Sequence, residues 1–96
     1  MNIKIKAVAG TLESSDILII VEPNSSEIEI ELESELMSQF GKSIKKVILD
    51  TCEELGVKQA KITVTDKGAI DAVIKSRVQT AIFRAAEIKN FNDFNN

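Results

Sequence analysis

The chain has 96 residues, of which 44% are apolar and 28% charged, and its net charge is −3; such a composition is typical of one globular domain with a buried core. It has no histidine and one cysteine, Cys52, which excludes an internal disulfide, a Cys-rich zinc site and His-based catalysis. The acidic balance argues against nucleic-acid binding, which needs clustered positive charge. Because no apolar run is long enough for a membrane helix or a signal peptide, we expect a single cytoplasmic domain spanning residues 1–96.

The first part of the chain carries three strand patterns. Residues 3–8 alternate in polarity, residues 17–21 form a nearly continuous apolar block, and residues 27–33 alternate glutamate with isoleucine or leucine. Each pattern favours a strand. The turn cluster at 23–26 is short, which favours a hairpin between the second and third strands. The glutamates of 27–33 indicate a solvated sheet face, although a basic partner surface could also dock on them.

A helical period follows the third strand. The apolar residues recurring at helical intervals are Phe40, Ile44, Val47, Ile48, Thr51, Cys52 and Leu55. Ser34 is one candidate for the N-terminal cap, and a start near Gly41 is the alternative. Gly56 suits the position after the helix end. Because Cys52 lies on the apolar side, where a free cysteine behaves as a small hydrophobe, we expect it to be buried and unreactive.

The last part of the chain adds a strand and a second helix. Residues 60–65 alternate again, residues 66–68 form a turn, and residues 89–96 are expected to fray. The second helix has an apolar face made of Ile70, Val73, Ile74, Val78, Ala81 and Ala85. The order is therefore β-β-β-α-β-α, which predicts a two-layer α+β domain with a mostly antiparallel sheet and both helices on one face.

Two polar features allow more than one interpretation. Lys67, before the second helix, and Lys75, Arg77 and Arg84 on it could receive phosphate groups, but an ordinary exposed face is the favoured explanation. The stretch AVAGTLESSD at 7–16 lacks the spacing of a phosphate-binding loop and of a nucleophile elbow. A hairpin turn explains its polarity, but a turn alone does not require two adjacent hydroxyl groups.

Four segments together resemble a known family. They are AVAGTLESSD at 7–16, FG at 40–41, ILD at 48–50 and DKGAID at 66–71. Over nearly its whole length the chain is similar to the acyl carrier protein, or gamma subunit, of citrate lyase. The segment GTLESSD is the most specific element of this resemblance, and a runner-up is the carrier subunit of malonate decarboxylase.

The resemblance implies a non-catalytic carrier that holds acetyl and citryl groups as thioesters. In this family the serine after Thr-Leu-Glu, here Ser14, carries covalently attached 2′-(5″-phosphoribosyl)-3′-dephospho-coenzyme A. The next position is often glycine and is Ser15 here. The implied partners are the citrate lyase alpha and beta subunits, a prosthetic-group transferase and an acetylating ligase. An unmodified regulatory or assembly module of α+β type is the alternative from another class of protein.

Overall fold

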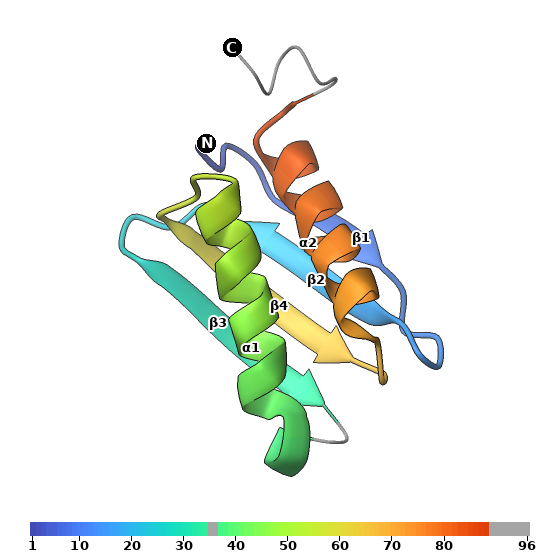
Figure 1. Ribbon diagram of the computed structural model, residues 1–96. Helices are drawn as coiled ribbons and strands as arrows, with labels where there is room; N and C mark the ends of the chain where they lie inside the picture. Colours follow the sequence, from blue (N-terminus) through green and yellow to red (C-terminus); the bar gives the residue numbers. More distant parts are fainter. Residues whose placement is uncertain (35–36, 89–96) are drawn as a thin grey trace.

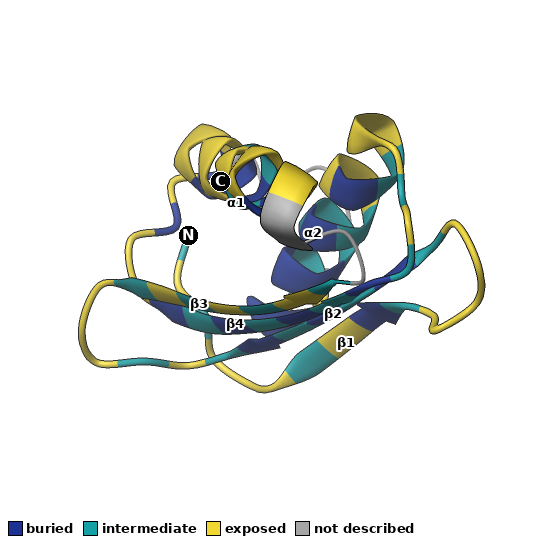
Figure 2. Ribbon diagram, turned by 90° about the horizontal axis from the view of Figure 1, so that it is seen from below, coloured by how far each residue is buried: buried dark blue, intermediate teal, exposed yellow. Residues whose placement is uncertain are grey.

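The computed structural model describes residues 1–34 and 37–88, and it has two layers. Its elements are β1 (Ala7–Gly10), β2 (Ile17–Glu22), β3 (Ile28–Ser34), α1 (Met37–Glu54), β4 (Ala60–Asp66) and α2 (Asp71–Ala85). Both helices pack on one face of a single sheet (Figures 1 and 2). The predicted α+β architecture and element order are therefore confirmed, whereas the expected fraying of 89–96 falls outside the described residues.

The strands are arranged in the order β1-β2-β4-β3 (Figure 1). β1 with β2 and β2 with β4 are antiparallel, while β3 runs parallel to β4. The predicted hairpin between β2 and β3 is wrong, because β4 lies between these two strands. Helix α1 instead forms the crossover that connects β3 to its parallel neighbour.

Burial explains why β2 and β4 occupy the centre of the sheet. The inward side chains of both strands, including Ile19 and Ile62, are fully buried, whereas those of β3 are only partly buried. The glutamates that alternate along β3 are exposed, and Glu31 lies 3.9 Å from Lys61. A strand with one charged face is suited to an edge, where charge discourages pairing with other chains.

The helices cover the sheet with the faces that the sequence indicates, except at their N-terminal ends. The buried side chains of this layer are Ile44, Ile48, Thr51 and Cys52 from α1, Leu55 directly after it, and Ile74, Val78, Ala81, Ile82 and Ala85 from α2. Phe40 and Ile70 are 49% and 69% exposed, so their predicted core positions are wrong. Phe40 lies in the first turn of α1, which extends past the strands (Figure 1), and Ile70 precedes α2.

The two ends of α1 bear on the predicted helix boundaries. The helix begins at Met37, ahead of the alternative start near Gly41. Ser34 ends β3, and its hydroxyl donates to Oδ2 of Asp66 at 3.0 Å. At the other end, Gly56 has a φ of 68°, and the amide of Val57 donates to the carbonyl of Cys52 at 2.9 Å. Gly56 is thus confirmed at the predicted position after the helix end.

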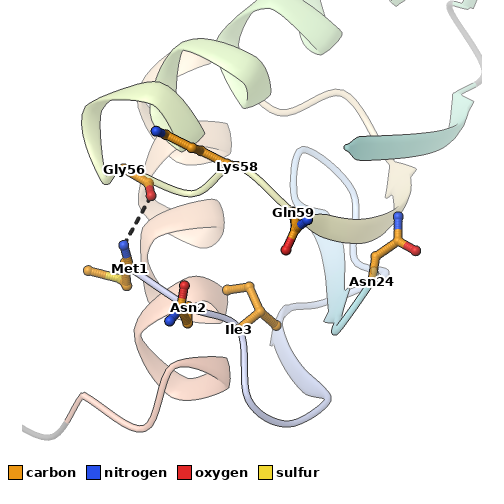
Figure 3. Close-up of a pocket in the computed structure, with 7 residues that line it drawn as sticks. All are labelled: Met1, Asn2, Ile3, Asn24, Gly56, Lys58 and Gln59. Carbon is orange, nitrogen blue, oxygen red and sulfur yellow. Dashed lines mark hydrogen bonds between the residues drawn. The ribbon is translucent and has the colours of Figure 1, made fainter. Parts of the chain in front are cut away.

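The N-terminal segment packs on α2 more than it extends the sheet. The strand predicted at 3–8 is present only as β1, because the amides of Lys4 and Ile5 both donate to the carbonyl of Ala85, at 2.9 and 3.0 Å. Figure 3 shows the amino group of Met1 donating to the carbonyl of Gly56, at 3.0 Å, beside a cavity of about 140 Å³. Within the described ranges, no helix is long and apolar enough to cross a membrane.

Candidate functional site in the loop joining β1 and β2

The loop of residues 11–16 ends in an exposed turn. The amide of Asp16 donates to the carbonyl of Glu13 at 3.1 Å, which places Ser14 and Ser15 at the centre of a β-turn. Ser15 has a φ of 67°, a conformation that glycine adopts most readily. Both serine side chains are exposed. In the part of the chain that the structure describes, the Ser14 hydroxyl makes no hydrogen bond, so it is open to an approaching molecule.

Asp16 organises this loop through four hydrogen bonds. Its Oδ2 accepts from the hydroxyl of Thr11 at 2.6 Å and from Nη2 of Arg77 at 3.0 Å. Its Oδ1 accepts from the amide of Ile17 at 2.7 Å and from Nε of Arg77 at 3.1 Å. These bonds, above all that from Arg77, hold the pKa of Asp16 well below its ordinary value of 3.8. At neutral pH the Asp16 carboxylate is therefore ionised, and both of its oxygens accept hydrogen bonds.

Backbone contacts fix both ends of the loop. Ser15 donates its amide to the carbonyl of Lys67 at 2.8 Å, and Lys67 donates its amide to the carbonyl of Asp16 at 2.9 Å. These two bonds extend the β2–β4 ladder beyond the Ile17–Asp66 pair. At the other end, Gly10 has a φ of 88°, and a Cβ there would lie 1.8 Å from the carbonyl oxygen of Ile17. The serine turn is thus an exposed tip on a fixed base.

The surroundings of the loop are partly apolar. Gly68, which follows β4, borders a cavity of about 210 Å³ between the N-terminal ends of the two helices. Its lining residues are Phe40, Ser43, Ile44, Asp66, Gly68, Ala69, Asp71 and Ile74. Leu12 in the loop is 57% exposed. The exposed hydroxyl group of Ser14 therefore lies at an end of the molecule that also presents apolar side chains.

The basic residues singled out in the sequence do not form one cluster. Lys75 pairs with Glu54 at 3.1 Å, Arg84 donates to the carbonyl of Val8 at 2.7 Å, and Arg77 binds Asp16. Of these residues, Arg77 belongs to the site, and sequence reasoning missed its role. Arg77 and Asp16 are 61 positions apart, and no spacing rule links a loop carboxylate to an arginine on a distant helix.

Cys52 takes no part in the site. Its side chain is fully buried, which confirms the prediction from the helical period, and burial raises the pKa of its thiol to about 11. The thiol is therefore protonated at neutral pH and shielded from solvent. Among the described residues, no group of three or more His, Cys, Asp or Glu side chains is arranged to hold a metal ion.

Comparisons with known proteins identify close relatives. The acyl carrier family model described as malonate decarboxylase delta subunit (MdcD) matches residues 4–85. The chain is 50% identical to the citrate lyase acyl carrier protein of Lactobacillus helveticus, covering 97% of this chain and 96% of that protein. It is 48% identical to the protein of the same name from Streptococcus mutans, with 96% and 91% covered.

Solved structures share the fold at much lower identity. A chain of the Pseudomonas malonate decarboxylase hetero-tetramer in complex with malonate is 17% identical, with a TM-score of 0.61 and 86% of each chain covered. Homoserine kinase from Cytophaga hutchinsonii is 16% identical, with a TM-score of 0.58; the match covers 96% of this chain and 38% of the kinase. At these identities the likeness shows a common fold alone.

Proposed function

We propose that the chain, which belongs to the family of citrate lyase acyl carrier proteins, carries acyl groups for a citrate lyase. The observation that carries this proposal is identity of 48–50% with citrate lyase acyl carrier proteins over nearly the whole chain. The chain is then a non-catalytic subunit. Its task is to bring a tethered acyl group to the active sites of its partners at high effective concentration.

The covalent group is assigned to Ser14. This serine follows Thr-Leu-Glu, lies at an exposed turn and has a hydroxyl free of hydrogen bonds within the described residues. These features suit a group that another enzyme must attach. The group, 2′-(5″-phosphoribosyl)-3′-dephospho-coenzyme A, supplies a terminal thiol that holds acyl groups as thioesters.

Attachment needs a separate transferase. Among the described residues the Ser14 hydroxyl donates no hydrogen bond to a base, so during attachment its proton passes to a base of the transferase. A bond forms between Ser14 Oγ and phosphorus, and a phosphoanhydride bond in the activated donor breaks to release the leaving group. The other proposed partners are the alpha and beta subunits of citrate lyase and an acetylating ligase, which loads the arm with acetate.

Citrate is favoured over malonate as the substrate of the complex. The citrate lyase relatives are 48–50% identical to the chain, whereas the malonate decarboxylase chain is 17% identical. An unmodified regulatory module remains the contrasting hypothesis. Intact mass separates the two, since a carrier isolated from its own host should exceed 10.6 kDa by a nucleotide-containing adduct.

The first prediction sets Ser14 against Ser15. Ser14→Ala, expressed with the attachment enzymes, should remain folded, lack the adduct and assemble into a complex that does not cleave citrate. Because the Ser14 hydroxyl is exposed, its removal should change the free energy of unfolding by no more than about 0.5–1 kcal/mol. Ser15→Ala is the matched control and should retain the adduct. Intact mass, peptide mapping and citrate cleavage measure these outcomes.

Two results would contradict this assignment. If Ser15→Ala loses the adduct and Ser14→Ala retains it, the attachment site is the neighbouring serine. If the wild-type protein gains no adduct in the presence of the transferase and its donor, the carrier function itself is wrong and the regulatory module becomes the better account.

A further inference from the structure

The side chain of Arg77 joins helix α2 to the loop that presents Ser14. Its Nε and Nη2 atoms bind the two carboxylate oxygens of Asp16 at 3.1 and 3.0 Å. This two-pronged geometry fixes both the direction and the distance of the carboxylate. The loop is thereby held against α2 as well as against the residues that follow β4.

The exposure of this pair indicates that it orients the loop more than it stabilises the whole domain. The Arg77 side chain is 40% exposed and that of Asp16 is 13% exposed, so solvent screens the pair on the Arg77 side and its contribution to folding is modest. Asp16 also keeps its bonds from Thr11 and the amide of Ile17 without Arg77. Loss of Arg77 should therefore leave the domain folded but free the serine turn to move relative to α2.

The charge of the pair suits the incoming group. Ser14 lies between Glu13 and Asp16 in the sequence, and a phosphate-containing donor is anionic. Pairing with Arg77 compensates the charge of Asp16, which is two residues from the acceptor hydroxyl. The same contact thus fixes the turn and reduces electrostatic repulsion beside it.

We infer that Arg77 is a positioning residue, which holds the turn around Ser14 in the conformation that the prosthetic-group transferase recognises. This inference rests on the proposed function. Without Arg77, only a fraction of the molecules hold the turn in the conformation that the transferase binds. The apparent affinity for the transferase then falls in proportion to that fraction. Once bound, the turn is in the same form as in the wild type, so the rate of the bound complex is retained.

The test compares attachment kinetics of full-length variants with the transferase and its activated donor, followed by intact mass. Arg77→Gln should raise KM about tenfold if the competent turn falls to roughly a tenth of the population, with kcat nearly unchanged. Arg77→Lys keeps the positive charge but loses the paired N–H donors of the guanidinium group, and it should give an intermediate KM. Lys75→Gln is the matched control, because Lys75 is an exposed cation on the same helix that pairs with Glu54.

A second readout separates positioning from simple loss of structure. In the unmodified protein, Arg77→Gln should speed hydrogen exchange at the amide of Ser15, which donates to Lys67, while exchange within β2 and β4 stays unchanged. Faster exchange throughout the sheet would instead show that Arg77 acts only on overall stability, and would overturn the inference.

The kinetic outcomes distinguish this inference from the proposed function. If the wild type and Lys75→Gln gain the adduct and Arg77→Gln gains it with the same KM, the positioning role is wrong and the carrier function stands. A fall in kcat with unchanged KM would place Arg77 in the chemistry of the bound complex and would also overturn positioning. If the wild type itself gains no adduct, the proposed function fails and the inference fails with it.

Discussion

Ser15 holds a backbone conformation that is costly for a residue with a side chain. Its φ of 67° lies in the left-handed region, and its amide is tied to the carbonyl of Lys67. The third position of a turn with this geometry favours glycine, so a serine there is held in a strained conformation. Ser15 is therefore a strained turn residue beside the Ser14 hydroxyl.

This strain gives a prediction for Ser15→Gly. Relief of the left-handed conformation outweighs the extra freedom that glycine gives the unfolded chain, so the free energy of unfolding should rise by about 0.5–1 kcal/mol. Urea denaturation of the unmodified protein measures the change, and Ser14→Gly is the control without a positive φ. A loss of stability in Ser15→Gly would indicate that the Ser15 side chain contributes a contact that outweighs the strain.

At the residue scale, periodicity identifies which side of a helix is buried but not where the core ends. It correctly predicts Ile48 and Cys52 as core residues of α1, and both are fully buried. It wrongly places Phe40 and Ile70 in the core, because a helical pattern continues past the point where the supporting sheet stops. The length of the sheet depends on tertiary pairing, which a local pattern does not record.

At the scale of elements, the number and type of strands could be predicted from the sequence, but their neighbours could not. The short connection between β2 and β3 favours a hairpin, yet β4 arrives through α1 and pairs with both strands. The inward side chains of β2 and β4 are fully buried, so these two strands are stabilised most at the centre of the sheet. The charged β3 is better suited to the edge. Local sequence patterns likewise do not predict the Asp16–Arg77 contact, because it depends on how α2 lies over the sheet.

The contact between the loop and α2 should make part of the stability depend on pH. The pKa of Asp16 is depressed in the folded protein below its ordinary value of 3.8. The contribution of ionised Asp16 to the free energy of unfolding is therefore fully present above that pH. As pH falls through and below that value, the unfolded state takes up the proton first and the contribution is lost. Stability should therefore decrease on acidification, and not on raising the pH.

The measurement is a difference between the wild type and Asp16→Asn, because other carboxyl groups also titrate in acid. Free energies of unfolding from urea denaturation should differ by a constant amount between about pH 7 and pH 5. Below about pH 4 the difference should shrink steadily. A difference that persists unchanged to about pH 3 would mean that Asp16 has the same pKa in the folded and unfolded states.

At the scale of the whole molecule, the two ends of the central strands differ in chemistry. β2 begins at the loop that carries Ser14 and β4 ends beside it, while Asn24, after β2, and Gln59, before β4, line the cavity next to Met1. Cys52 lies in the core between the sheet and the helices, and it is the one cysteine of the chain. The fold thus keeps its own thiol inside and presents the Ser14 hydroxyl outside.

This separation predicts how many thiols react in the unmodified and modified proteins. The pKa of Cys52 is raised to about 11 by burial, so it forms little thiolate near neutral pH and is not accessible. An aromatic disulfide reagent should therefore label the native unmodified protein slowly, and should label one thiol at once when the protein is unfolded in denaturant. The modified, deacylated protein should show one rapidly reacting thiol in its native state, because the thiol of the attached arm is outside the core.

Cys52→Ala and Ser14→Ala assign these two reactions. Cys52→Ala should abolish the reaction of the unfolded unmodified protein and leave the rapid reaction of the modified native protein, provided that the variant folds; thermal unfolding checks this, since the change removes a buried side chain. Ser14→Ala should abolish the rapid native reaction alone, and loading the arm with an acetyl group should abolish it reversibly. Rapid labelling of the native unmodified wild type would instead place Cys52 at the surface. Absence of a rapid thiol in protein with the full adduct mass would mean that the arm is sheltered by the domain and does not swing free.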